Sequence, residues 1–285
     1  MTSKFCAATL VALLPSFALA CKGGDKKPTP AATGTGTGSA AAATPPTKAP
    51  TKAPARGPER AVYSLVDNRL AAHLYRNGGL VVPGGSTGFA KYTRFGNTEK
   101  IKTPSWQLRQ TQDQTKVAIM SGASARIDVP VTAAELTGDP VIRVRAYSAT
   151  PRAFSVRVNG NKDVNGQATE GWTVIELKPP PGQLKEGENE LLFFTRGGGL
   201  AIDWIQVGGT APAEATATRF YDAASKSLTL PDGGGLAYYV QVPDGGRVTG
   251  DLADGACEVL VKATAADGAA ADGRLTGLGS AVDLA

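Results

Sequence analysis

The stretch Phe154-Ser155-Val156-Arg157-Val158-Asn159-Gly160-Asn161 contains a strong β-hairpin signal. A type I′ turn needs positive φ at both central positions, and asparagine and glycine are the residues that adopt this conformation most readily. Asn159-Gly160 directly follows a run rich in aromatic and β-branched residues. The stretch therefore predicts a strand that ends at Val158, a tight turn, and a second strand that begins near Asn161.

Similar short runs lie on both sides of this hairpin, separated by Gly, Pro, Asn and Asp, which is typical of strands in β-sandwiches. They cover residues 80–82, 89–95, 126–131, 141–147, 154–158, 172–177, 190–195 and 201–207. We therefore expect an all-β chain with a jelly-roll-like sandwich over residues 61–209. The one helix that we expect runs from Ser64 to Asn77, with Leu70 and Leu74 on one face and Gly78 to end it.

An internal repeat predicts a second module. The segment from Leu80 to Tyr92 matches the segment from Leu228 to Tyr239, with the same Pro-x-Gly turn and a shared tyrosine. The first copy needs about 130 residues to close a sandwich. We therefore expect residues 217–285 to form an incomplete second sandwich. Two hypotheses follow: the chain is the N-terminal piece of a longer protein, or its reading frame is cut short.

The N-terminus has the three parts of a bacterial signal peptide. Lys4 supplies positive charge, Phe5–Leu14 is apolar, and the small residues Ala18 and Ala20 precede Cys21. Ala-Leu-Ala-Cys resembles a lipobox, which implies removal of residues 1–20 after Ala20 and lipidation of Cys21. Ala18 stands where leucine is usual, and the same residues suit an ordinary signal peptidase, which would release a soluble secreted protein. We expect a lipid anchor, and Lys22 resembles the pattern of lipoproteins sent to the outer membrane.

Residues 21–60 contain Gly, Thr, Ala, Pro and Lys with no large apolar side chain, so we expect a disordered tether. Residues 22–60 hold seven basic and two acidic residues, and this segment accounts for the chain's formal net charge of +5. The rest of the chain is close to neutral. Because nucleic-acid-binding domains need a basic face, we expect no nucleic-acid partner. The positive tether suits an anionic membrane surface.

Catalytic and metal-binding patterns are missing from the sequence. Within the expected folded region Cys257 is the lone cysteine and His73 the lone histidine, too few for a zinc site. Cys257 alternates with Val259 and Val261, which favours a core position, and a bridge to a cysteine further along a longer chain is the alternative. No nucleophile triad, phosphate loop or zinc-protease motif occurs. We expect no catalytic residue, no metal and no cofactor.

The three tryptophans differ in their sequence positions. Trp172 and Trp204 lie in mid-strand, which favours the core. Trp106 lies at a loop or a strand start, which makes it the best candidate for an exposed aromatic platform of the kind that stacks on sugar rings. Asn161, in the hairpin loop, is the second candidate ligand-binding residue.

Four short motifs resemble galactose-binding-like β-sandwich modules. They are Val156–Gly160, Gly171-Trp172, Gly187–Leu191 and Ile202–Ile205. The resemblance implies a non-catalytic module that binds carbohydrate. A module with a purely structural role is a further hypothesis.

The order of a lipobox, a tether and tandem sandwiches is also similar to the N-terminal accessory region of lipid-anchored sulfatase-like proteins. The Cys-x-Pro-x-Arg or Ser-x-Pro-x-Arg nucleophile motif of that family is missing from the sequence. This alternative therefore implies an accessory fragment whose catalytic domain lies elsewhere.

Overall fold

A computed structural model describes residues 8–13, 63–93, 106–196, 199–213, 220–230, 233–240, 242, 246–252, 259–264 and 270–284. The chain divides into one unit of residues 1–16 and 65–285 and another of residues 17–64. Ala20, Cys21 and Cys257 lie outside the described residues. Where the chain is described, strands dominate and the only helices are two short 3-10 turns, which confirms the all-β prediction. In the same ranges no helix has the length and apolar character needed to span a membrane.

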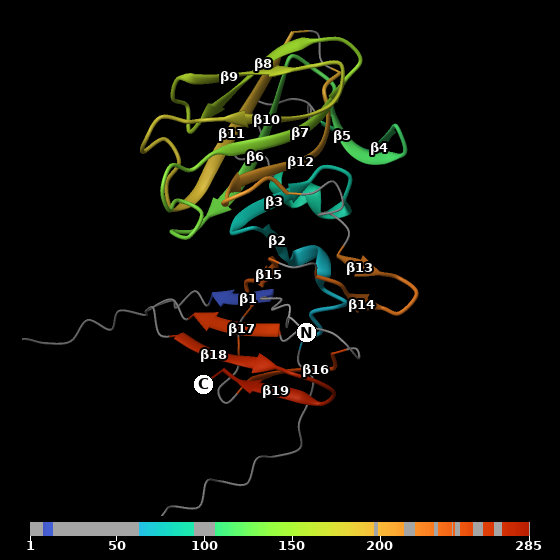
Figure 1. The fold of residues 1–285 in the computed structure, drawn as a ribbon, viewed down its shortest axis with the longest axis vertical. Coiled ribbons are helices and arrows are strands. Elements are labelled where there is room, and N and C mark those ends of the chain that lie inside the picture. Colours follow the sequence, from blue (N-terminus) through green and yellow to red (C-terminus); the bar gives the residue numbers. More distant parts are fainter. Residues whose placement is uncertain are drawn as a thin grey trace, which may run out of the picture. The chain divides into compact units, whose positions relative to one another are not determined.

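Two antiparallel sheets form the sandwich (Figure 1). The first sheet has the order β10 (Gly171–Leu177), β7 (Ile142–Ser148), β12 (Ala201–Gly208), β3 (Gly79–Pro83) and β2 (His73–Arg76). The second has the order β6 (Ser124–Val131), β11 (Gly187–Thr195), β8 (Arg152–Val158) and β9 (Asp163–Ala168). Alternate residues of the two inner faces, such as Val144, Ile205, Ile127 and Phe193, fill one buried core.

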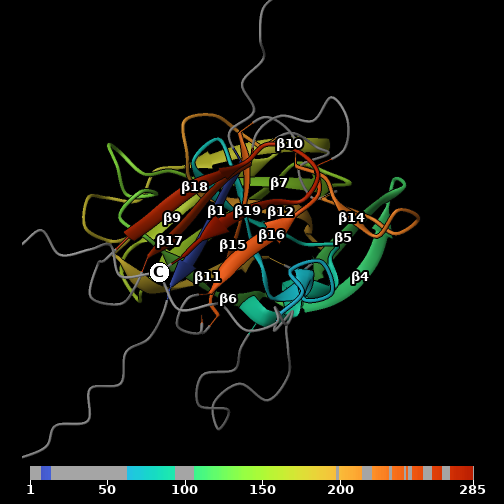
Figure 2. The ribbon, with the colours of Figure 1, turned by 90° about the horizontal axis from the view of Figure 1, so that it is seen from below.

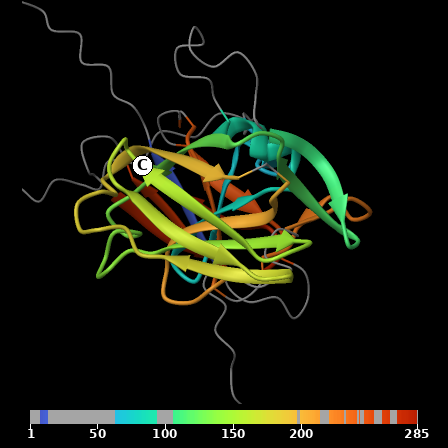
Figure 3. The same ribbon diagram turned by 90° about the horizontal axis from the view of Figure 1, so that it is seen from above.

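A hairpin of β4 (Trp106–Gln112) and β5 (Thr115–Met120) extends the first sheet beside β12. Its far end projects from the body of the sandwich (Figure 1 and Figure 3). The register of β4 against β5 shifts between Gln107 and Gln110. Arg109 lies in this shift with a φ of 58°, so β4 bends away from a regular ladder.

The first sheet continues beyond β2 into the C-terminal part of the chain. β15 (Gly234–Tyr238) pairs with β2, β1 (Ala8–Leu13) lies between β15 and β17 (Val259–Thr264), and β18 (Ala270–Leu275) follows (Figure 2). The remaining strands form two small two-stranded sheets, β13 (Tyr221–Asp222) with β14 (Ser227–Leu228) and β16 (Arg247–Gly250) with β19 (Ser280–Asp283). Val261, Leu275 and Val282 form a separate small core here.

The outer face of β12, β3 and β2 is also covered. Leu74, Val81 and Trp204 point away from the main core and pack beside Leu236 and Tyr238 of the neighbouring strand β15, and the partly buried side chains of Leu65, Phe220 and Leu228 pack on the same cluster. Trp204 is fully buried, which confirms the sequence prediction for this tryptophan. The central strands of the first sheet are therefore buried on both faces, whereas β10 and β7 keep an outer face that β15 does not cover.

The predicted helix from Ser64 to Asn77 is wrong. Only a 3-10 turn, η1 (Arg69–Ala71), forms there, and the chain then enters strand β2. Asn77 and Gly78 have φ values of 49° and 76° and close the β2–β3 hairpin, with Arg76 opposite Gly79. Asn77-Gly78 is the same turn signal as Asn159-Gly160. Pairing of β2 with both β3 and β15 outweighs the helical spacing of the leucines.

The predicted strand at residues 89–95 is also wrong over its described part, residues 89–93. Residues Thr87–Tyr92 form the 3-10 helix η2, which buries Phe89 and Tyr92, three residues apart, on one side. The matching segment of the internal repeat, Leu236–Tyr239, lies mostly in strand β15. The two repeated segments therefore differ in secondary structure.

The predicted hairpin at Asn159-Gly160 is confirmed. Their φ values are 50° and 73°, and the backbone N–H of Asn161 donates to the carbonyl of Val158 at 2.9 Å. The Asn159 amide also anchors the neighbouring strand, because its Nδ2 donates to Asn189 Oδ1 at 2.9 Å. Asn189 in turn donates to the carbonyls of Lys185 and Gly187 at 2.7 and 2.9 Å. This fully buried asparagine therefore fixes the loop that leads into β11.

We predict that Asn189→Ala lowers the free energy of unfolding by about 3 kcal/mol, because it leaves several buried backbone groups without partners. Urea unfolding followed by tryptophan fluorescence measures the change. Asn165→Ala in β9 is the matched control, since Asn165 is exposed and its removal should change stability by less than about 0.5 kcal/mol. Equal unfolding midpoints for the two variants would contradict the assigned role of Asn189.

Candidate functional site

Trp106 does not form an exposed platform, and this prediction is wrong. Its side chain is 6% exposed, and its indole Nε1 donates to the carbonyl of Arg126 at 2.8 Å. The ring makes edge contacts with Phe89 and Phe193, at centroid distances of 5.3 and 5.9 Å. Because β4 joins the sheet at its first residue, the ring enters the core with its one polar group satisfied.

Asn161 is exposed at the β8–β9 turn, and its Nδ2 donates to the carbonyl of Val158 at 3.0 Å. The structure therefore places the two residues predicted to bind ligand in different environments, one in the core and one at a turn. A ligand contact by Asn161 stays a prediction.

The outer face of β10 and β7 carries a different set of aromatic and charged side chains. Ile175 and Leu177 point into the core, so Trp172 and Val174 point outward on the same strand. The register places Trp172 opposite Tyr147 and Val174 opposite Arg145. Trp172 and Tyr147 are half-buried and Val174 is 42% exposed. Trp172, Tyr147, Arg145, Asp203 and Asp113 are called the Trp172 patch below.

Arg145 is held in place by a buried carboxylate. The register of β12 against β7 shifts between Ile202 and Trp204, which makes Asp203 an extra residue in the ladder. The Asp203 side chain is 2% exposed and forms an ion pair with the Arg145 guanidinium. The backbone at this shift is also held from the side of β3, because the N–H of Gly84, directly after β3, donates to the Asp203 carbonyl at 2.7 Å. A Cβ atom at Gly84 would lie 2.1 Å from the Ile202 carbonyl oxygen, so the approach needs glycine.

Trp172 is fixed by contacts from three directions. The Arg145 guanidinium carbon lies 4.2 Å from its ring centroid, in a cation–π contact. The Tyr147 ring meets it edge to face at 5.5 Å. Its indole Nε1 donates to Asp113 Oδ2 at 3.2 Å. The ring is therefore preorganised, and its exposed part lies on the side away from the guanidinium or at its edges.

The sequence contained a signal for this patch. Trp172, Val174 and Glu176 share one face of β10, while Thr173, Ile175 and Leu177 share the other. A glutamate on the tryptophan's face indicates solvent on that side. The expectation of a core position for Trp172 is therefore wrong in part, because the ring is packed by neighbours but not enclosed.

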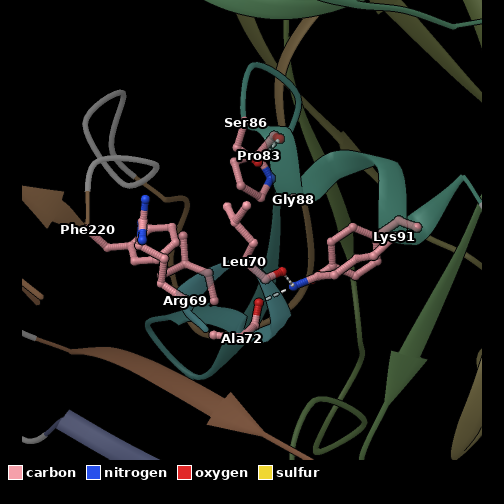
Figure 4. A pocket seen from close by; sticks show the side chains of 10 residues that line it. Arg69, Leu70, Ala72, Pro83, Ser86, Gly88, Lys91 and Phe220 are labelled. Atoms are coloured by element: carbon pink, nitrogen blue, oxygen red, sulfur yellow. Dashed lines mark hydrogen bonds between the residues drawn. The ribbon is translucent and has the colours of Figure 1, made fainter. Parts of the chain in front are cut away.

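A second candidate site is a small pocket between η1, η2 and Phe220 (Figure 4). Lys91 donates to the carbonyls of Leu70 and Ala72, and burial lowers the pKa of its ammonium to about 8. The space amounts to about 20 Å³, which is room for one or two waters and not for a sugar ring. This pocket is therefore part of the packing of the two 3-10 helices.

His73 also has a packing role. Its Nδ1 lies 3.0 Å from the Tyr92 hydroxyl, and its ring contacts Tyr92 and Tyr239 edge to face at 5.5 and 5.2 Å. Among the residues that the structure describes, no group of three or more His, Cys, Asp or Glu side chains is placed to hold a metal ion.

Comparison with known proteins gives matches in structure only. No protein-family model and no curated protein sequence matches the chain. A CBM35 module from Cellvibrio japonicus matches with a TM-score of 0.27 and 17% identity, over 50% of this chain and 96% of the module. A CBM6 module from Clostridium stercorarium, solved in complex with cellobiose, matches with a TM-score of 0.32 and 9% identity, over 48% and 98%. A family 35 carbohydrate-binding module from Clostridium thermocellum matches with a TM-score of 0.29 and 15% identity, over 49% and 98%. TM-scores below 0.5 do not establish a common ligand.

We predict that Arg145→Met destabilises the protein by about 3 kcal/mol, because it removes the cation that forms an ion pair with the buried Asp203 carboxylate. Chemical unfolding measures the loss. The double variant Arg145→Met with Asp203→Leu is the control, since removing both charges should recover most of the stability. A double variant as unstable as the single one would show that the pair is not what holds Arg145.

Proposed function

We propose that this chain is a non-catalytic, glycan-binding module that is held at the cell envelope by a lipid on Cys21. The Trp172 patch carries the first half of the proposal. An exposed aromatic surface flanked by fixed donors and acceptors matches the two faces of a sugar ring, which presents C–H groups to an aromatic plane and hydroxyls around its edge.

The shape of the patch favours a polymer over a small molecule. Trp172 and Tyr147 lie opposite each other on neighbouring strands, and Val174 and Arg145 form the next row of the same face. Rows on one face of a sheet are about 7 Å apart, so the patch extends along the strands. An open sheet face of this kind can lie along a chain of sugars, whereas a free monosaccharide would gain contact with one row only.

The N-terminal sequence supports the second half of the proposal. The apolar run, the small residues before Cys21 and the basic segment 22–60 form the expected order of export signal, lipid site and tether. Removal of residues 1–20 would also remove β1, so β15 and β17 would no longer share that strand in the processed chain. A module tethered in this way would hold the cell close to a glycan, or hold a glycan close to the envelope.

We predict that Trp172→Ala lowers the affinity for a bound glycan at least tenfold, because the stacking surface is lost. A glycan array followed by isothermal titration with the selected oligosaccharide measures the change. Leu278→Ala is the control, since Leu278 is an exposed apolar residue outside the Trp172 patch. If the two variants bind equally well, or if the wild-type chain binds no glycan, the proposed function is wrong.

We predict that cells fed a labelled fatty acid incorporate the label into the wild-type chain and not into Cys21→Ser, because the thiol is the acceptor of the lipid. Membrane fractionation of the same cells should show the wild-type protein with membranes and the variant without them. An unlabelled wild-type chain would show that an ordinary signal peptidase processes it.

A further inference from the structure

The β4–β5 hairpin holds an uncommon backbone conformation at its tip. Asp113 and Gln114 have φ values of 46° and 61° and form the turn between Gln112 and Thr115. Both positions of such a turn favour glycine, asparagine or aspartate, and another side chain in the left-handed region costs about 1–2 kcal/mol. The described hairpins at Asn77-Gly78 and Asn159-Gly160 have favourable residues at both positions, whereas this hairpin has one at Asp113 and not at Gln114.

The strained turn places one carboxylate beside the aromatic surface. Asp113 Oδ2 accepts the Trp172 indole N–H at 3.2 Å, which puts the carboxylate at the edge of the ring. Asp113 is exposed, and this is the only hydrogen bond that its side chain makes within the described ranges. An ionised carboxylate accepts about four hydrogen bonds, so most of its capacity faces solvent next to Trp172.

We propose that Asp113 is a ligand-contacting residue that determines specificity, and that the ligand of the Trp172 patch is an uncharged glycan. The inference rests on the proposed function. A sugar ring stacked on the indole directs its equatorial hydroxyls outward around the ring perimeter, where the Asp113 carboxylate lies. Hydroxyl groups are then the donors that this acceptor requires.

The balance of charges at the patch favours an uncharged ligand over an acidic one. Arg145 is paired with Asp203, and Arg143 Nε lies 2.7 Å from Glu176 Oε1 on the next row. Both arginines of this face are therefore already neutralised. Asp113 carries the charge that remains without an ionic partner among the described residues, so a uronate or sulfate group would meet a negative site.

Two substitutions at Asp113 remove the carboxylate and leave the conformation of the turn unchanged. Asp113→Gly removes the side chain and leaves a residue that adopts a φ of 46° without strain. Asp113→Asn keeps the size, an acceptor oxygen and a tolerance for left-handed backbone, and it removes the charge. Gln114→Gly is the matched control, because Gln114 is exposed at the same tip and makes no hydrogen bond in the part of the chain that the structure describes.

The test is titration of the full chain and its variants with cellohexaose, xylohexaose, mannohexaose and hexagalacturonate. We expect wild type to prefer a neutral hexasaccharide, Asp113→Gly to lose about tenfold in affinity for it, and Gln114→Gly to be unchanged. Asp113→Asn should bind the neutral sugar nearly as well and should raise the ratio of hexagalacturonate to neutral binding about fivefold.

Several outcomes overturn the inference and leave the proposed function standing. The first is that wild type binds hexagalacturonate more tightly than every neutral sugar. The second is that Asp113→Gly and Gln114→Gly lose equal affinity for the neutral sugar. The third is that Trp172→Ala loses affinity and Asp113→Gly does not. A wild-type chain that binds none of the four sugars and no array glycan overturns both.

Discussion

The ion pair between Arg145 and Asp203 is the interaction on which the candidate site depends. Asp203 is 2% exposed in a strand whose two faces are both covered, so its charge is tolerable only with a partner. Arg145 supplies that partner from the next strand and is thereby fixed in place. The same guanidinium lies over the Trp172 ring. The buried ion pair therefore also fixes the orientation of this partly exposed ring.

The register shift in β12 determines which side chains of this strand point outward, next to the Trp172 patch. Before the shift Ile202 points into the main core, and after it Trp204 points outward while Ile205 points inward. Trp204 is then buried in the second cluster, which includes Ala213, Leu65 and Phe220, whereas Trp172, two strands away, lies outside that cluster. One sheet therefore presents a buried outer face at β12, β3 and β2 and an open one at β10 and β7. The open part carries the polar and aromatic side chains.

Local patterns in the sequence predicted most strands of the sandwich, but not β4 and β5, and they gave a helix where β2 forms. Asn159-Gly160 was sufficient for its hairpin because the turn conformation is a property of those two residues. The spacing of Leu70 and Leu74 imitates a helix, yet residues 73–76 pair with two strands, one of them about 160 residues further along the chain. Nothing within a local window reveals that partner.

The tryptophans show the same limit for the candidate site. The assignment of Trp106 was wrong and that of Trp172 was wrong in part, because burial depends on which face another layer covers. Trp106 opens a strand whose inner side meets Phe89 and Phe193, both far away in sequence. Trp172 shares its face with Val174 and Glu176, and that alternation was readable in the sequence, but the Arg145 and Asp113 contacts were not.

The charges of the chain are divided between two segments in a way that suits two different surfaces. The surplus of positive charge lies in residues 22–60, while the region beyond them is close to neutral. Under the proposed function a basic tether is attracted to anionic lipids within about a Debye length, roughly 8 Å at physiological ionic strength. A neutral module is not drawn to the same surface, so its aromatic patch stays available to an uncharged polymer. Basic residues on the folded module would work against this separation, since they would favour the lipid surface over the glycan.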